Sequence, residues 1–186
     1  ISLALSEQTR QVCLQLIKNF KAGGASISFD VNYRANLWDE ETARATIQQV
    51  LPYVDVLFVS EETSRRMFQK TGDLQDILKS YCTEYGVRVV ASTQRTVISP
   101  KKHDFTSLIY AAESDRFYTE APYTDIDVVD RVGSGDAYVA GVLFGMLKYG
   151  DPQKALEFGN ATSSVKNTIP GDLPSSDFKE ISGIIR

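Results

Sequence analysis

The heptapeptide from Asp130 to Asp136 has residue types and a spacing that could do chemistry. Its two glycines bracket a serine, so the backbone can approach a ligand closely and adopt unusual φ/ψ values. An apolar helical pattern follows at once, which predicts that the amides of Gly133, Ser134 and Gly135 crowd a helix N-terminus. Unpaired amides and the helix dipole attract negative charge at such a place. Asp136, in the first helical turn, would set a base beside this cradle for an anion.

The helix that follows the turn carries a stripe of small residues. Ala137, Gly141 and Gly145 recur every four residues and therefore share one face, which predicts close contact with a neighbouring backbone. The other positions are apolar nearly all round, which is typical of a central, buried helix. A purely structural interpretation, in which Asp136 only caps a buried helix, stands beside the functional one. The flanking Asp130 and the stripe of small residues favour the functional interpretation.

The same heptapeptide resembles the C-terminal signature of the ribokinase-like (PfkB) carbohydrate kinases, Asp-Thr-x-Gly-Ala-Gly-Asp. Arg131 replaces the Thr and Ser134 replaces the Ala, and this Asp-Arg-Val variant is similar to the 2-keto-3-deoxygluconate kinase branch. The resemblance implies that the glycine turn is the anion hole for a transferred phosphoryl group. It also implies that Asp136 takes the proton of the sugar hydroxyl. No Gly-Lys-Ser/Thr follows the turn, so the segment is not a Walker P-loop.

A second string, Phe29 to Trp38, resembles the same branch and follows a strand predicted over 26–31. Ligands of open parallel sheets gather at the carboxyl ends of strands. On the residues alone, a bidentate grip of Arg34 on a carboxylate or phosphate and a surface ion pair are equally favoured. The resemblance implies that Asn32 and Tyr33 touch nucleotide and substrate, and that Arg34 meets the carboxylate of a sugar acid.

The resemblance also assigns a place for Mg²⁺ and the phosphates. Ser60 and Thr63 stand where the wider family has Asn-x-x-Glu, and the sugar-acid branch can carry Ser at the first position. Ser60 is then a nucleotide contact, and Glu62 would reach the metal through water, with Asp130 as a further metal candidate. On the residues alone, acidic side chains in a first helical turn are expected to be dipole partners.

Three further regions are compared with the family. The segment 87–132 has no glycine, whereas the family usually has a glycine-bearing nucleotide loop there, so hydroxyls of Ser92 and Thr93 would contact phosphate oxygens instead. The resemblance makes Asn160 a nucleotide contact, although a solvated polar residue is an equal alternative. Asp172, in a Pro-Gly-Asp turn, would reach the substrate.

Composition excludes several classes of function. The chain has 186 residues, 42% of them hydrophobic, and a net charge of −4, which suits one soluble core and argues against nucleic acid as a partner. No apolar run approaches the ~20 residues of a membrane span. Cys13 and Cys82 lack metal-type spacing, so a reduced, cytoplasmic chain is expected. The single histidine, His103, is predicted in a solvated turn over 101–105, which argues against a histidine-based triad or metal centre.

Hydrophobic periodicity alternates helices with strands, as in layered α/β folds. We therefore expect a three-layer α/β/α sandwich with a mostly parallel sheet, ribokinase-like, in which 1–186 is the C-terminal part of a longer kinase domain. Helices are predicted over 3–22, 40–51, 74–84, 137–149, 153–167 and 177–185, and strands over 26–31, 54–59, 87–91, 97–100, 106–111 and 116–120.

The resemblance implies an ATP- and Mg²⁺-dependent kinase, with 2-keto-3-deoxygluconate as the expected acceptor. A kinase for fructose, ribose or a nucleoside is the nearest alternative, and it would not need a carboxylate clamp at Arg34. The alternative of another class is a non-catalytic fragment that binds nucleotide or nothing, because the sugar-binding half is missing. A fragment with an exposed sheet edge would also favour self-association into homo-oligomers.

Overall fold

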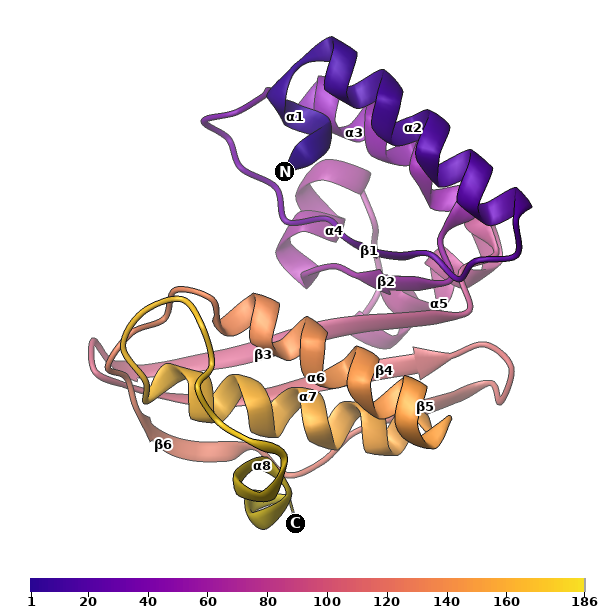
Figure 1. Ribbon diagram of the computed structural model, residues 1–186. Coiled ribbons are helices and arrows are strands. Elements are labelled where there is room, and N and C mark those ends of the chain that lie inside the picture. Colours follow the sequence, from indigo (N-terminus) through magenta and orange to yellow (C-terminus); the bar gives the residue numbers. More distant parts are fainter. Residues whose placement is uncertain (186) are drawn as a thin grey trace. The chain divides into compact units, whose positions relative to one another are not determined.

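The computed structural model describes residues 1–185, which form an α/β fold with one mixed sheet (Figure 1). The elements in chain order are α1 (Ser2–Leu5), α2 (Glu7–Ala22), β1 (Ser28–Asp30), α3 (Glu40–Val50), the 3-10 turn η1 (Leu51–Tyr53), β2 (Val56–Phe58), α4 (Glu61–Phe68), α5 (Leu74–Tyr85), β3 (Val89–Ser99), β4 (Lys102–Ala111), β5 (Arg116–Tyr118), β6 (Tyr123–Asp127), α6 (Ser134–Tyr149), α7 (Pro152–Asn167) and α8 (Phe178–Ile184).

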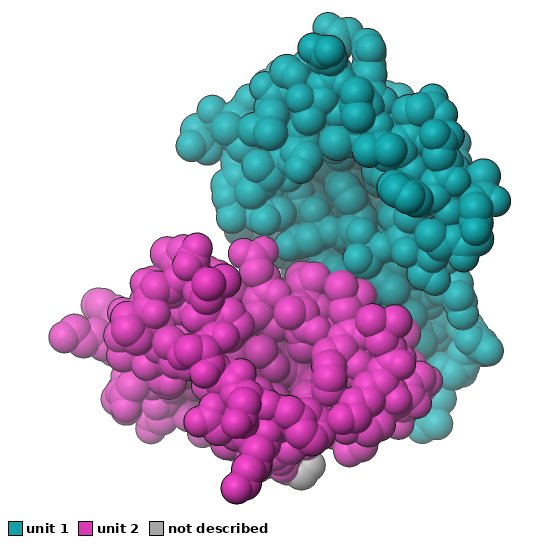
Figure 2. All heavy atoms as spheres, viewed as in Figure 1, with its two compact units in different colours: residues 1–92, 110–116 teal, residues 93–109, 117–186 magenta. Residues whose placement is uncertain are grey.

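The chain divides into two compact units, 1–92 with 110–116 and 93–109 with 117–186 (Figure 2). The strands are hydrogen-bonded in the order β1-β2-β3-β4-β5, and β6 pairs with β4. The pairs β1/β2 and β2/β3 are parallel, with Leu57 opposite Phe29 and Val90, whereas β4/β6 is antiparallel. The prediction of an α/β fold is therefore confirmed. No helix among residues 1–185 is both long and apolar enough to span a membrane.

Short polar side chains set where most helices begin. Each N-cap side chain accepts an amide hydrogen bond from the first helical turn, which satisfies a donor that the helix itself leaves unpaired. The predicted helix over 3–22 is wrong in one respect, because Ser6 is extended and caps α2, so that the region is two helices. The other N-caps of this kind are Asp39, Ser60, Asp73, Asp151 and Asp177.

The region after residue 91 differs from the prediction. A loop was expected over 92–96, but β3 runs unbroken from Val89 to Ser99. Its hydroxyl-bearing and β-branched residues suit an extended strand, and β4 lies beside it in the sheet. β4 already begins at Lys102, so the predicted turn over 101–105 is also wrong and His103 is buried, with 3% of its surface exposed. The strand β6 was not predicted.

The stripe of small residues on α6 packs against α7, and the two helices lie side by side (Figure 1). A Cβ at Gly141 would stand 2.5 Å from the carbonyl oxygen of Phe158, and one at Gly145 would stand 2.5 Å from the Cα of Ala155. The predicted close contact is therefore confirmed. The prediction that α6 is buried all round is wrong, because Leu147 is 88% exposed, and α7 is the helix with the longest run of buried residues.

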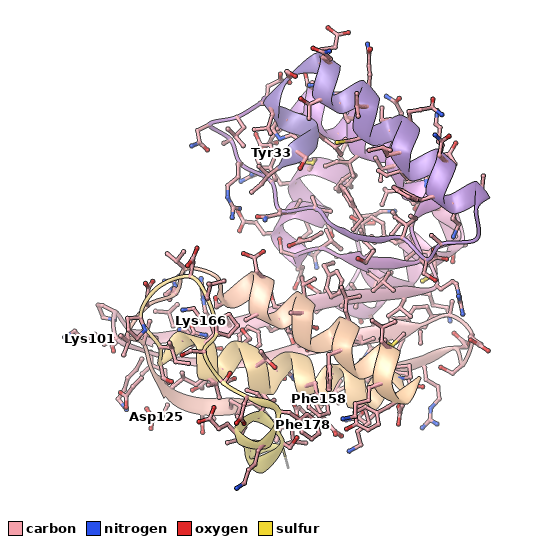
Figure 3. All side chains as sticks on the ribbon, in the orientation of Figure 1. Tyr33, Lys101, Asp125, Phe158, Lys166 and Phe178 are labelled. Atoms are coloured by element: carbon pink, nitrogen blue, oxygen red, sulfur yellow. The ribbon has the colours of Figure 1, made fainter. Side chains whose placement is uncertain are left out.

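An aromatic cluster holds the C-terminal helix α8 onto α6 and α7. Phe178 of α8 stacks on Phe158 of α7 at 5.9 Å between ring centroids (Figure 3), and Phe144 of α6 lies 5.9 Å from Phe178. Aromatic contacts of this kind add to the free energy of burial. The cluster anchors the far end of the segment 168–177, which carries Asp172.

Candidate active site

The glycine turn of 130–136 adopts the geometry that only glycine tolerates. Gly133 is the N-cap of α6 with φ = +79°, and its carbonyl accepts the amide of Ala137 at 2.8 Å. A Cβ on Gly133 would lie 1.9 Å from the carbonyl oxygen of Asp172. The turn therefore rests directly on the backbone of the 168–177 segment, and a side chain here would push the two apart.

The start of α6 leaves main-chain donors free. Within residues 1–185, the amides of Gly133, Gly135 and Asp136 have no hydrogen-bond acceptor. The amide of Ser134 differs from the prediction, because it donates to the carbonyl of Arg131 at 3.2 Å and so closes the turn. Free amides at the positive end of a helix form a site for an anion.

Asp136 presents a carboxylate at this helix start. The residue is exposed, and its side chain makes no hydrogen bond or ion pair with the part of the chain that the structure describes. The carboxylate is therefore not used as a cap or as an internal ion-pair partner. An exposed carboxylate beside free amide donors can accept a proton from a hydroxyl group that approaches the same helix end.

The carboxylate of Asp130 holds the turn through two main-chain amides. Its Oδ1 accepts the amide of Val132 at 2.9 Å and its Oδ2 accepts the amide of Gly171 at 3.0 Å. These two hydrogen bonds, first that from Val132, hold the pKa of the carboxyl below its ordinary value. The side chain thereby joins the glycine turn to the loop that carries Asp172.

The C-terminal end of α7 also supports the turn. The carbonyl of Asn167 accepts the amides of Val129 at 2.8 Å and Asp130 at 3.2 Å. The hydroxyl of Ser163 donates to the carbonyl of Ser134 at 3.0 Å. Sequence reasoning did not find these supports. The only signal was a set of polar residues on a helix that is otherwise buried.

The candidate nucleotide and substrate contacts that follow β1 lie in the unit of residues 1–92 with 110–116. Asn32 has a left-handed backbone (φ = +36°), and the Tyr33 hydroxyl donates to the carbonyl of Trp38 at 3.1 Å. Arg34 is exposed, and one of its guanidinium nitrogens donates to the Tyr33 carbonyl at 3.2 Å. No carboxylate of the described chain pairs with Arg34, so the surface ion pair that the residues alone allowed does not form.

In the same unit, Ser60 and Glu62, the predicted phosphate and metal contacts, each interact with a neighbouring residue of α4. Ser60 caps α4, with its Oγ accepting the amide of Thr63 at 3.1 Å. The side chain of Glu62 is 81% exposed and lies 3.3 Å from Arg66. Among residues 1–185, no three or more His, Cys, Asp or Glu side chains gather as a direct metal site. A metal ion held through water does not require such a group.

The remaining predicted nucleotide contacts differ in how far their side chains are exposed. Ser92 is 1% exposed, with a hydroxyl that has no partner in the described residues, whereas the adjacent Thr93 is exposed. Asn160 is fully buried, and its Nδ2 donates to the Oε1 of Glu120 at 2.7 Å. Asn160 and Ser92 thus lie out of direct reach of solvent, and their nucleotide contacts stay predictions.

Positive charge gathers in the unit that holds the turn. Burial first, and then the charges of Arg95 and Arg131, lower the pKa of His103 from its ordinary value of 6.5. Burial, followed by the charge of Arg131, likewise lowers the pKa of Arg95. Since Arg131 lies within the heptapeptide, these guanidinium groups add to the attraction of the helix start for an anion.

The buried His103 predicts a dependence of stability on pH. Its folded pKa lies below its unfolded pKa, so the unfolded chain binds more protons and the free energy of unfolding falls as the pH drops below about 6.5. One group of this kind limits the slope to about 1.4 kcal/mol per pH unit. Urea unfolding between pH 8 and pH 5 should show a shallower profile for His103→Gln than for the unaltered chain. Parallel profiles would contradict the assignment.

Comparison with known proteins agrees with this geometry. The model of the pfkB family carbohydrate kinases matches residues 1–177. A 2-dehydro-3-deoxygalactonokinase of Haloferax volcanii is 30% identical over all of this chain and 55% of its own length. A 2-dehydro-3-deoxygluconokinase of Escherichia coli is 26% identical over 88% of this chain and 51% of its own. The chain spans about half the length of the curated relatives it matches.

Solved structures give the same result. A PfkB family carbohydrate kinase from Listeria grayi superposes with a TM-score of 0.92 and 32% identity, covering 99% of this chain and 57% of that one. A 2-dehydro-3-deoxygluconokinase from Thermotoga maritima superposes with a TM-score of 0.91 and 28% identity, covering 98% and 56%. Sequence, family model and fold agree, and the chain belongs to the pfkB family of carbohydrate kinases.

Proposed function

We propose that the protein carrying this chain transfers the γ-phosphoryl group of ATP to a hydroxyl of a sugar acid, with 2-keto-3-deoxygluconate as the expected acceptor. The observation that carries the proposal is the start of α6, where free amides adjoin the exposed carboxylate of Asp136. Membership of the pfkB family supports the reaction class. The names of the relatives from Haloferax volcanii and Escherichia coli support a 2-keto-3-deoxy sugar acid as acceptor.

The chemistry divides between the base and the amides. Asp136 removes the proton of the acceptor hydroxyl as that oxygen attacks the γ-phosphorus, the bond from the γ-phosphorus to the β-phosphate oxygen breaks, and ADP leaves. The amides of Gly133 and Gly135 stabilise the charge that develops on the phosphoryl oxygens, and the amide of Ser134 keeps the turn closed. Arg131, within the same turn, adds positive charge to this unit.

The residues present fit Mg²⁺ held through water. When bound, Mg²⁺ would neutralise charge on the ATP phosphates. Asp130 uses one lone pair of each oxygen on an amide, and Glu62 is exposed, so both can accept hydrogen bonds from metal-bound water. Asn32, Tyr33, Ser60 and Thr93 are the nucleotide contacts in this proposal, because each retains surface exposure.

Arg34 is the proposed determinant of the acidic acceptor. Its guanidinium is exposed and has no carboxylate partner among residues 1–185, so it is available to a substrate carboxylate. Asp172, also exposed, is the second proposed substrate contact. A neutral sugar would gain nothing from the guanidinium of Arg34.

Arg34→Ala is therefore expected to raise KM for the sugar acid by about 10- to 100-fold, the equivalent of a charge-assisted hydrogen bond, and to leave KM for ATP nearly unchanged. Arg34→Lys should recover only part, because lysine keeps the charge without the bidentate geometry. Arg88→Ala is the control, since Arg88 is exposed and its pairing with Glu113 is at 3.7 Å. Equal increases in both KM values would favour an acceptor without a carboxylate.

The function itself is tested by assaying the protein that carries this chain against a panel of acceptors. The panel contains 2-keto-3-deoxygluconate, 2-keto-3-deoxygalactonate, fructose, ribose and a nucleoside, each with MgATP. We expect the highest kcat/KM with a 2-keto-3-deoxy sugar acid. A preference for a neutral sugar would show that the acceptor is not a sugar acid. Absence of phosphorylation with every acceptor would contradict the kinase proposal.

A further inference from the structure

Lys166 is a buried charge that the proposed reaction does not use. It lies in the last turn of α7 (Figure 3), and none of its surface is exposed. Lysine is almost never fully buried without a partner, because removing an ammonium group from water is costly. No carboxylate of the described chain lies within ion-pair distance of its Nζ.

The partners of this ammonium group are main-chain oxygens. Nζ donates to the carbonyl of Asp130 at 3.2 Å and to the carbonyl of Ile169 at 3.0 Å. Ile169 is the second residue after α7, so the bond to its carbonyl is a local one just beyond the helix end. The contact with Asp130 is different, because that residue is 36 positions away and begins the glycine turn.

The two carbonyls belong to the two segments that form the helix-start site. Asp130 begins the turn that carries Gly133, and Ile169 begins the loop that carries Asp172. These segments already touch where Gly133 meets the Asp172 carbonyl, a contact that leaves no room for a Cβ. A single cation therefore links both segments.

We propose that Lys166 acts as a built-in monovalent cation, a positioning residue that holds the anion-binding turn against the 168–172 loop through two main-chain carbonyls. The inference rests on the proposed function for its effect on phosphoryl transfer. The charge contributes beyond the two hydrogen bonds, because it lies near enough to the Asp130 carboxylate to attract it through space.

Removing the ammonium group leaves two carbonyl oxygens that face a space of about its size. Carbonyl oxygens are the ligands that replace the hydration shell of K⁺, and NH₄⁺ donates hydrogen bonds to the same groups. Lys166→Met keeps most of the side-chain volume and removes the charge. In that variant a small monovalent cation from solution should enter and restore the position of the turn.

The experiment has two readouts on the protein that carries this chain. The first is hydrogen–deuterium exchange of the amides in 129–136, which does not depend on turnover. The second is steady-state kinetics with MgATP and the best acceptor of the panel. Both are run in sodium, potassium and ammonium chloride at constant ionic strength. Lys154→Met is the matched control, because Lys154 lies on the same helix and pairs with the largely buried Glu157 rather than with the 129–136 segment.

In sodium chloride, the amides of 129–136 should exchange faster in Lys166→Met than in the unaltered protein. The kcat of this variant should fall by about 10²-fold, which is the order expected for a small misplacement of a reacting group. KM for ATP should change less. Potassium or ammonium should slow the exchange and restore kcat with saturation, whereas the unaltered protein and Lys154→Met should respond to neither ion.

Lys166→Gln is a second variant, which offers two neutral donors and separates the hydrogen bonds from the charge. It should retain slow exchange better than Lys166→Met and still respond to potassium. The proposal would be overturned if Lys166→Met exchanged the 129–136 amides at the rate of the unaltered protein. It would also be overturned if neither potassium nor ammonium changed exchange or kcat in either variant. If the unaltered protein phosphorylates no acceptor, the proposed function fails, and the exchange measurement still decides the role of Lys166.

Discussion

Asp136→Asn is expected to lower kcat by about 10²- to 10⁴-fold, the usual contribution of a general base, while ATP still binds with nearly the affinity of the unaltered protein. Asparagine has the shape of aspartate but cannot accept the proton of the acceptor hydroxyl. The fold should be unaffected, because the Asp136 carboxylate is exposed and bonds no residue of 1–185. The measurements are single-turnover kinetics and nucleotide titration.

Asp127→Asn is the matched control for this prediction. Asp127 is an exposed carboxylate of the same unit, and within residues 1–185 it forms one ion pair, with Lys102 at 3.5 Å. Surface pairs of this kind contribute little to stability, so kcat should stay within about twofold of the unaltered value. Turnover near normal in Asp136→Asn would remove Asp136 from the role of base. A loss of ATP binding of the same size as the loss of kcat would assign it to the nucleotide instead.

Gly133→Ala is expected to abolish most activity and to lower the free energy of unfolding by roughly 2–5 kcal/mol, the sum of a left-handed alanine and a forced shift of packed backbone. The added Cβ would stand 1.9 Å from the carbonyl oxygen of Asp172, which is main chain and cannot swing away. The turn or the 168–172 loop must therefore move, and displacement of the amides on the order of 1 Å costs about 10²-fold in rate. Urea unfolding and kcat together check both effects.

Gly150→Ala separates the two causes. Gly150 also has a positive φ, +64°, and ends α6, but a Cβ there meets nothing within 4 Å. Its substitution should cost only the strain of a left-handed alanine, about 1–2 kcal/mol, and should leave kcat unchanged. Equal losses of stability in Gly133→Ala and Gly150→Ala would mean that the contact with Asp172 has no energetic weight.

Features that depend on a few neighbouring residues could be predicted from the sequence alone. The positive φ at Gly133, the close contact of Gly141 with α7 and the cap at Asp39 each follow from local geometry. They follow because backbone freedom, helical spacing and capping involve residues at most a few positions apart. The candidate base and the free amides of the glycine turn were therefore visible in the sequence itself.

Several of the errors lie where the structural partners are distant in sequence. The expected loop over 92–96 is a strand, because a neighbouring strand is available to pair with it. His103 is interior although its neighbours Lys101, Lys102 and Asp104 suggested a solvated turn, since β4 turns alternate side chains inward. Asn160 points to Glu120, 40 residues away, which no periodicity can reveal.

The sequence by itself determined the family, the α/β fold and the turn at which we place the chemistry. It could do so because the glycine spacing and the start of a helix depend on consecutive residues. The tertiary structure alone decided what holds that turn. Asn167 and Gly171 reach it through main-chain atoms and Lys166 through its side-chain ammonium, from the C-terminal end of α7 and the loop that follows. Hydrogen bonds to main-chain carbonyls and amides leave no mark on residue type, since every residue has these groups.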